Sequence, residues 1–387
     1  MIYELKPDEF HKISNFFRMK EIARARYFLE NNKKVKVYVD NPDSPKTIAF
    51  QCEGSVYLDG DYTNESFLSS VIPEVNKEIA KITFMSEWSL VGGKNYDILI
   101  KLLYEPMEYE KLHYEMTELK FDWRKAVIPE GFELREMTKE LLEDNTLKNK
   151  EPIIKSFEYY FNGSLDEYCE KSGGFCIVKG DEIVSYATFV PYVDNKLYGL
   201  GIIETNPEHR KKEFGSIVAA ATSELCLLKG GIMNWETHSY NKASQKLAEK
   251  IGHKLITSTK TLFSYFDRFV SCEENFLLHK NVTKDYNKAL RLLEEMYSLR
   301  IDDPDFLWKG DERYGFQNYS YCKHNYNLAQ VYELSGKIDK AIESFNKAEE
   351  LGKNHPVQLE HLNIDCKDPI KFFEDKITEL RNKGNGR

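Results

Sequence analysis

The sequence contains no run of about 18 apolar residues, the minimum for a membrane-crossing helix, so a transmembrane helix is excluded. Residues 1–8 show neither the basic segment and apolar run of a secretory signal nor the Met-Gly start of a myristoylation signal. Basic residues are not in excess, because 54 Lys and Arg against 63 Asp and Glu give a formal charge of −9. We therefore expect neither nucleic acid nor membrane as a partner.

Cysteine motifs are also missing. The seven cysteines are odd in number, widely spaced and include no Cys-x-x-Cys pair. This pattern predicts reduced thiols in a cytoplasmic protein rather than a disulfide framework or a zinc site, and no metal is expected. What is present is a globular composition, with 41% hydrophobic and 13% aromatic residues in a chain of 387. At about 150 residues per domain, this length predicts two to three domains.

Residues 1–125 mix strand and helix patterns and contain no chemical motif. Pro42 and Pro45 separate the first two segments that are expected to form strands. Strands are expected over residues 34–39, 47–51, 55–58 and 81–85, and helices over residues 64–80 and 97–104. This part is predicted to be an N-terminal α/β domain.

Residues 126–270 begin after a linker around Pro129 and predict a mixed α/β layer in the order βααβββαβαββ. Thr138 is a good helix N-cap, and Gly180-Asp181 and Asp194-Asn195 are typical of hairpin turns. Strands are expected over residues 131–137, 175–178, 182–190, 196–205, 232–237, 254–258 and 261–266, and helices after Thr138 and over residues 211–229 and 241–250.

Residues 275–387 switch to helical periodicity, and no strand is expected there. Small and aromatic residues recur at fixed offsets, namely Ala329, Tyr332, Gly336, Ala341, Phe345 and Ala348. Ala289, Leu293 and Met296 repeat part of this spacing, with an insertion containing Asp302-Asp303-Pro304 and Trp308 between the two segments. The spacing resembles the tetratricopeptide repeat, and this resemblance implies a helical tail that binds a protein partner.

The segment with the clearest chemistry is a strand-to-helix turn. A strand ends at Thr205, and a helix begins within the basic stretch Arg210–Lys212 and the pair Gly215-Ser216. A helix start gathers backbone N–H groups without partners at a positive helix end, which is where phosphate binds. The turn therefore predicts a polyphosphate site.

A second motif follows, in which Asn241, Ser244, Leu247 and Gly252 stand at spacings of three, six and eleven residues from the first. Together with Arg210 and Gly215, this motif resembles the GNAT (GCN5-related N-acetyltransferase) superfamily. Its first signature has the form Arg/Gln-x-x-Gly-x-Gly/Ala. Within that superfamily, Trp235, Asn241, Ser244 and residues 248–252 most resemble the zwittermicin-resistance type, in which a degenerate copy of the same fold precedes the catalytic half.

The resemblance implies a GNAT fold with a central splayed mixed sheet over residues 126–270, a degenerate GNAT-like half over residues 1–125, and an all-α tail over residues 275–387. It also implies acetyl-CoA as co-substrate, bound at the turn and against the splayed strand. The residues expected to bind it are Ile203, Thr205, Arg210, Lys211, Lys212, Glu213, Phe214, Gly215, Ser216, Asn241 and Ser244.

Three residues are candidates for acid–base chemistry, and each has a second interpretation. Glu204 is a candidate base, but strand alternation turns its side chain away from Ile203 and Thr205. His238 could relay a proton or be an ordinary loop histidine, and Tyr198 lies further back on the same strand as Glu204.

Two positions depart from the GNAT pattern. Glu213 stands where the superfamily usually has its first glycine, and Ala248 stands where many members carry a general-acid tyrosine. Catalysis is therefore less firmly predicted than acetyl-CoA binding.

The resulting hypothesis is an acetyl-CoA-dependent N-acetyltransferase that acts on a primary amine of a small molecule. The acceptor, such as an aminoglycoside-like or polyamine-like cation, is expected between the two halves. One alternative is a catalytically weak acyl-CoA sensor or adaptor that uses its helical tail for protein partners. The other is an acetyltransferase for a peptide or protein amine.

Overall fold

The computed structural model describes residues 2–16, 27–29, 35–52, 54–81, 83, 85–90, 96–161, 163–191, 197–300, 307–308, 319–362, 364 and 366–385. The chain forms two compact units. We call residues 1–75, 87–99 and 108–263 the sheet unit, and residues 76–86, 100–107 and 264–387 the helical unit. Among the described residues, no helix is both long and apolar enough to span a membrane.

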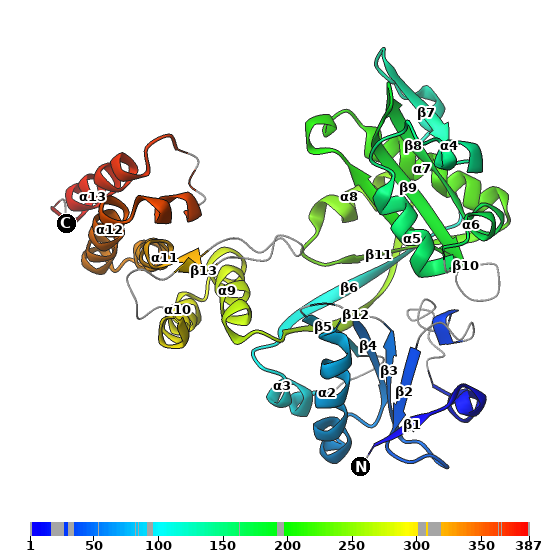
Figure 1. The fold of residues 1–387 in the computed structure, drawn as a ribbon, viewed down its shortest axis with the longest axis horizontal. Coiled ribbons are helices and arrows are strands. Elements are labelled where there is room, and N and C mark those ends of the chain that lie inside the picture. Colours follow the sequence, from blue (N-terminus) through cyan, green and yellow to red (C-terminus); the bar gives the residue numbers. More distant parts are fainter. Residues whose placement is uncertain are drawn as a thin grey trace. The chain divides into compact units, whose positions relative to one another are not determined.

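A mixed sheet of 12 strands runs through the N-terminal and central parts of the chain (Figure 1). In spatial order its strands are β1 (Tyr3–Leu5), β2 (Val35–Val39), β3 (Thr47–Cys52), β4 (Ser55–Gly60), β5 (Met85–Leu90), β12 (Lys254–Tyr265), β6 (Met107–Met116), β11 (Ile232–His238), β10 (Leu197–Thr205), β9 (Glu182–Pro191), β8 (Gly173–Lys179) and β7 (Phe132–Glu136). The predicted mixed α/β class is confirmed.

The two halves of this sheet repeat one topology. In the first half, β2, β3 and β4 form an antiparallel meander, and α2 (Glu65–Ile79) leads from β4 to its parallel neighbour β5. In the second half, β8, β9 and β10 form the same meander, and α7 (Phe214–Leu228) leads from β10 to its parallel neighbour β11. The chain therefore consists of two halves with the same topology, as the sequence predicted.

The last strand of each half lies beside the other half. β6, which follows α3 (Asp97–Leu102), pairs antiparallel with β11. β12, which follows α8 (Lys242–Ile251), lies next to β5. The halves are thus joined by strand exchange within one sheet rather than by a linker alone.

Several sequence predictions need correction. The strand expected over residues 81–85 begins only at Met85 and runs to Leu90, because Trp88 and Leu90 are the side chains that the core buries. The sequence analysis did not predict β6. Four of its residues are glutamate or lysine, so its sequence does not show a clear alternation of apolar and polar residues. The two strands expected between residues 254 and 266 form one continuous strand, β12.

Three helices, rather than two, follow β7. They are α4 (Lys139–Glu143), α5 (Glu151–Phe161) and α6 (Leu165–Lys171). Thr138 caps α4 as predicted, because its side chain accepts a hydrogen bond from the backbone N–H of Leu141. The predicted hairpin at Gly180-Asp181 is present, since Lys179 pairs with Glu182, whereas the turn predicted at Asp194-Asn195 lies outside the described residues.

The helical unit contains α9 (Arg268–Leu278), a π-helical turn (His279–Thr283), α10 (Tyr286–Arg300), α11 (Tyr321–Leu334), α12 (Ile338–Asn354) and α13 (Pro369–Asn385) (Figure 1). The expectation of no strand was wrong, because the two-residue strands β13 (Leu307–Trp308) and β14 (Tyr319–Ser320) pair in this region. Residues 302–304 of the predicted insertion lie outside the described residues. Ala289, Ala329, Ala341 and Ala348 are fully buried between the helices. The tetratricopeptide assignment and the division at residues 125 and 275 stay predictions.

Candidate active site

The site begins where two parallel strands separate. β10 and β11 are paired only from Leu197 to Gly199 on β10, and β10 is irregular between Leu200 and Ile203. Thr188 supports this irregularity by accepting a hydrogen bond from the backbone N–H of Ile202 at 3.2 Å. Gly201 is required beside it, because a Cβ at that position would lie 2.7 Å from Thr188 Oγ1. The strand edge at the end of β10 is therefore left unpaired on the side that faces β11.

The turn after β10 holds the start of α7 against this gap. Lys211 and Glu213 have φ angles of 63° and 62°, a left-handed conformation that favours glycine. Glu213 occupies the position of the first signature glycine, so the backbone there keeps the conformation that a glycine would adopt. Phe214 is buried against Phe132 and anchors the first turn of α7. The first N–H groups of α7 have no partner within the helix.

The start of α8 forms the opposite wall. The Oδ1 atom of Asn241 accepts a hydrogen bond of 3.0 Å from the backbone N–H of Ser244, so Asn241 is the helix N-cap. Trp235 Nε1 on β11 donates to Ser244 Oγ at 2.9 Å. These two bonds fix α8 beside the end of β11.

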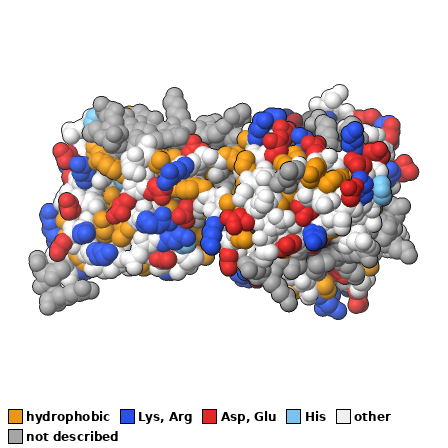
Figure 2. All heavy atoms as spheres, turned by 90° about the horizontal axis from the view of Figure 1, so that it is seen from below, with side chains coloured by type: hydrophobic (Ala, Val, Ile, Leu, Met, Phe, Trp, Pro, Cys, Tyr) orange, Lys and Arg blue, Asp and Glu red, His pale blue; other side chains and the backbone are white. Residues whose placement is uncertain are grey.

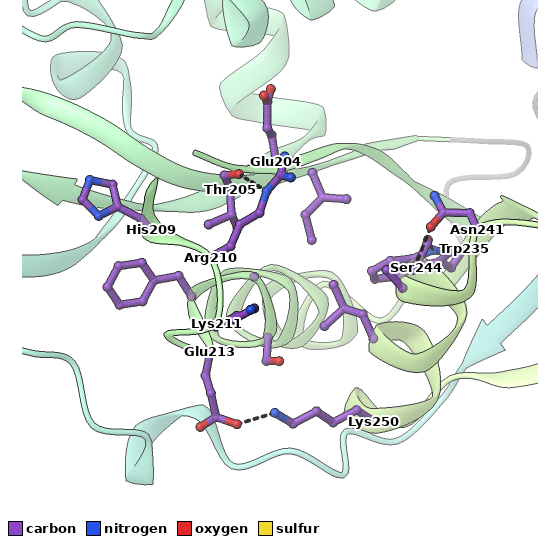
Figure 3. Close-up of a pocket in the computed structure, with 16 residues that line it drawn as sticks. Glu204, Thr205, His209, Arg210, Lys211, Glu213, Trp235, Asn241, Ser244 and Lys250 are labelled. Atoms are coloured by element: carbon purple, nitrogen blue, oxygen red, sulfur yellow. Dashed lines mark hydrogen bonds and ion pairs between the residues drawn. The ribbon is translucent and has the colours of Figure 1, made fainter. Parts of the chain in front are cut away.

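Between these elements lies a pocket of about 620 Å³ (Figure 3). Its lining residues are Ile203, Glu204, Thr205, His209, Arg210, Lys211, Glu213, Phe214, Gly215, Ser216, Trp235, Asn241, Ala243, Ser244, Leu247 and Lys250. Ten of the eleven residues predicted to bind acetyl-CoA line this pocket. Lys212 does not, because its ammonium turns toward the Phe132 ring, 5.1 Å from the centroid, and toward His209 Nδ1 at 3.3 Å.

Sequence reasoning missed several lining residues on α8. Ala243, Leu247 and Lys250 join Asn241 and Ser244 on one side of this helix. Residues 241, 244, 247 and 250 are three positions apart, a spacing that places them along one helical face. That periodicity was available in the sequence as a signal for Lys250.

Charges at the pocket favour an anion. Arg210, Lys211 and Lys250 contribute positive charge, and Arg210 Nε donates to the backbone oxygen of Thr205 at 3.2 Å. The carboxylate of Glu213 turns away from the pocket centre toward Lys250 and forms an ion pair with it (Figure 3). This pairing reduces the repulsion that Glu213 would exert on a bound phosphate.

The structure does not bring the three catalytic candidates together. Glu204 projects to the other face of β10, where its Oε2 accepts a hydrogen bond of 2.8 Å from the Tyr186 hydroxyl (Figure 3). Glu204 also lines a second pocket of about 310 Å³. Burial, and next the Glu204 carboxylate, raise the pKa of Tyr186.

The other two candidates lie outside the large pocket. Tyr198 is buried against Phe189, with ring centroids 5.3 Å apart, and burial raises its pKa. His238 stacks on Tyr240, and burial followed by the charge of Lys111 lowers the pKa of its imidazole. Ala248 is fully buried in the core that contains Trp235, so this position supplies no acid group.

The described residues contain no group of three or more His, Cys, Asp or Glu side chains that could hold a metal ion. On the face drawn in Figure 2, acidic and basic side chains are interspersed. The site is therefore best described as a local cationic pocket at a helix start.

The fold of this chain is similar to that of a solved protein. The chain is similar to a GCN5-related N-acetyltransferase-like protein from Streptococcus suis, at 16% identity over 67% of this chain and 98% of that one, with a TM-score of 0.51. A GCN5-related N-acetyltransferase from Sphaerobacter thermophilus is 11% identical over 68% of this chain and 95% of its own, with a TM-score of 0.48. A tandem GNAT protein from the clavulanic acid biosynthesis pathway is 8% identical over 68% and 98%, with a TM-score of 0.43.

A search of the curated proteins found no match. The model of one family, described as GNAT acetyltransferase, matches residues 18–262, which is more than half of the chain and spans both halves of the sheet. This chain belongs to the GNAT acetyltransferase family.

Proposed function

We propose that this protein transfers an acetyl group from acetyl-CoA to a primary amine of a small molecule. The observation that carries the proposal is the pocket at the divergence of β10 and β11, where a helix start, three cationic side chains and an unpaired strand edge meet. The helix start and the cations suit a pyrophosphate, and the edge of residues 203–205 suits the amide groups of a pantetheine arm.

The acetyl thioester supplies the acyl group. In the transfer, the amine nitrogen forms a C–N bond to the acyl carbon, and the C–S bond breaks. The amine loses one proton, and the leaving sulfur gains one, so that free thiol is released. We assign the removal of the amine proton to Glu204, directly or through water, because its carboxylate lies at the end of β10 with one oxygen held by Tyr186.

The direct test is a calorimetric titration with acetyl-CoA and, separately, with CoA. We expect binding in the micromolar range, weakened about tenfold or more in Arg210→Ala, because a charge-assisted hydrogen bond is lost. Lys212→Ala is the matched control, since this neighbouring basic side chain does not line the pocket. Absence of binding at millimolar acetyl-CoA in the parent protein would refute the proposal.

A second candidate function is acyl-CoA binding without turnover. Ala248 favours it, because the buried methyl group at this position cannot protonate a leaving thiolate. Release of free thiol with amines distinguishes the two functions. An enzyme releases thiol at a rate that depends on the amine, whereas a sensor binds acetyl-CoA and releases none.

A further inference from the structure

Lys280 lies outside the acetyl-CoA pocket and has surroundings that are unusual for an ammonium group. It belongs to the π-helical turn His279–Thr283 that follows α9, where His279 Nδ1 lies 2.8 Å from Thr283 Oγ1. Turns of this kind are frequent at functional sites. The Lys280 side chain is half-buried and extends toward α11 within the helical unit. The position is therefore a candidate for chemistry that the acetyl-CoA pocket does not perform.

The partners of the Lys280 amine are neutral. Its Nζ donates a hydrogen bond of 2.9 Å to Gln330 Oε1 on α11, and it lies 5.1 Å from the centroid of the fully buried Phe276 ring on α9. The Gln330 amide is itself held in place, because its Nε2 donates to the Tyr326 hydroxyl at 2.7 Å. None of the described carboxylates forms an ion pair with Lys280. The amine therefore lacks the negative charge that normally keeps a half-buried lysine protonated.

The charges near Lys280 oppose its protonation. Among the described groups, the one whose charge acts on it is Lys323, the cation that α11 buries against Glu273 on α9. Neither Glu274 on α9 nor His279 on the same turn offsets this charge. Burial, and next the charge of Lys323, lower the pKa of Lys280 from 10.5 to about 8. A large fraction of Lys280 side chains then carries a neutral, nucleophilic amine in mildly alkaline solution.

We propose that Lys280 is a covalent modification site for acyl thioesters. The neutral amine nitrogen forms a bond to the acyl carbon, the C–S bond breaks, and the proton that the nitrogen loses goes to the leaving thiolate. The products are an amide on Lys280 and a free thiol. This reaction goes beyond the proposed acetyl transfer, because its acceptor is a side chain of the helical unit and the pocket at β10 and β11 takes no part in it.

The contacts of Lys280 also suit the acylated product. An acylated lysine keeps one N–H group, so it can still donate a hydrogen bond to Gln330 Oε1. It carries no charge, so acylation removes both the desolvated ammonium and its repulsion from Lys323. We therefore expect acylation at Lys280 to leave the melting temperature of the protein unchanged or to raise it.

The test exposes the full chain to S-acetyl-N-acetylcysteamine, a thioester without the nucleotide of CoA, and follows each lysine by peptide mass spectrometry. Lys284, which is exposed just after the same turn, is the reference site. At pH 8 we expect Lys280 to react about tenfold faster than Lys284, because its larger neutral fraction outweighs the lower nucleophilicity of a weaker base. The rate at Lys280 should level off above pH 8, whereas the rate at an ordinary exposed lysine rises toward pH 10.

Two substitutions of one residue isolate the cause. Gln330→Glu keeps the size of the side chain but places a carboxylate against Lys280, so we expect the reaction at Lys280 to slow about tenfold at pH 8. Gln330→Met removes the same hydrogen bond without adding charge. It is the matched control, and its rate at Lys280 should stay within about twofold of the parent rate.

Two results would overturn the inference. One is a rate at Lys280 that does not exceed the rate at Lys284 in the parent protein at any pH. The other is a Gln330→Glu variant in which Lys280 reacts as fast as in the parent. Since the thioester lacks the nucleotide, neither result depends on whether acetyl-CoA binds at the pocket, and the proposed function stands or fails by its own titration.

Discussion

Glu213 shows how a single residue can depart from a family signature and keep its geometry. Its φ of 62° is the conformation that the signature glycine would supply, and its carboxylate is paired with Lys250. The charge near the helix start opposes a bound phosphate, while the backbone conformation costs about 1 kcal/mol. We therefore expect glutamate at position 213 to change the affinity for CoA rather than the backbone conformation of the turn.

We expect Glu213→Gln to bind CoA about threefold to tenfold more tightly, because it removes a negative charge beside the helix start. Glu213→Gly should gain the same affinity and also relieve the left-handed strain. Calorimetry at low and high salt measures both effects. Glu208→Gln, which removes an exposed carboxylate from the preceding turn, is the control and should leave affinity nearly unchanged. Weaker CoA binding by Glu213→Gln would show that this carboxylate helps the turn to form.

Glu204 is the second residue whose role can be isolated. Glu204→Gln keeps the size of the side chain and can still accept the Tyr186 hydrogen bond, but it cannot take a proton. We expect kcat to fall about a hundredfold while the Kd for acetyl-CoA stays the same. Tyr186→Phe should have a smaller effect, because it removes only the supporting bond. An unchanged kcat in Glu204→Gln would assign the base elsewhere.

At the scale of elements, the N-cap of α8 connects stability to the pocket. Asn241 caps the helix through Ser244, and Ser244 in turn accepts the Trp235 indole N–H. Asn241→Ala is expected to lower the free energy of unfolding by about 1 kcal/mol and to weaken acetyl-CoA binding. Asn241→Asp, which keeps a capping oxygen, should retain most of the stability. Urea denaturation and calorimetry report the two effects, and equal stability of Asn241→Ala and the parent would contradict them.

The elements also show where sequence reasoning succeeds and fails. The β10–α7 turn and α8 were predicted with their boundaries nearly correct, because glycines, caps and apolar periodicity mark them locally. β6 was not recognised, because Lys111 and His113 alternate with Leu112 and Tyr114. Its buried polar residues have partners on other strands, and such partners cannot be read from a local pattern.

At the scale of the whole molecule, the helical unit contains a buried ion pair that links α9 to α11. Glu273 Oε1 lies 3.4 Å from Lys323 Nζ, and both residues are more than nine-tenths buried. Burial raises the pKa of Glu273 to about 7 from an ordinary value of 4.5, and Lys323 only partly opposes this shift. The folded state therefore binds the Glu273 proton more tightly than the unfolded state does, so protonation of Glu273 stabilises the fold. This stabilisation is complete below about pH 4.5, the ordinary pKa of the carboxyl group.

That contribution is lost as the pH rises through about 7. We therefore expect the free energy of unfolding of the parent protein to fall relative to that of Glu273→Gln between pH 4.5 and 7.5. The comparison cancels the contributions of other carboxylates, which are the same in both proteins. Urea denaturation followed by far-ultraviolet circular dichroism measures it. A difference that does not change with pH would show that Glu273 titrates normally.

Strand exchange makes the two halves of the sheet interdependent. β6 comes from the first half and pairs along β11, the strand that carries Trp235. We expect residues 126–387, expressed without the first half, to lack a cooperative unfolding transition and to bind no acetyl-CoA, because β11 loses a neighbour and β12 loses β5. The full chain is the control. A soluble fragment that binds acetyl-CoA would show that the second half folds alone.

The sequence by itself determined the fold class, the turn at residues 210–216 and the α8 face, because these features depend on local backbone conformation and on spacing along one element. Only the tertiary structure decided that Glu213 points to Lys250, that Lys212 leaves the pocket for Phe132, and that the Glu204 carboxylate accepts a hydrogen bond from Tyr186. It also decided that Glu236, His113 and Thr259, which lie on three different strands, meet at the His113 imidazole. Local sequence patterns determine where helices and strands form. Ion pairs and the exchange of strands between the two halves are long-range interactions, and they exist only in the folded chain.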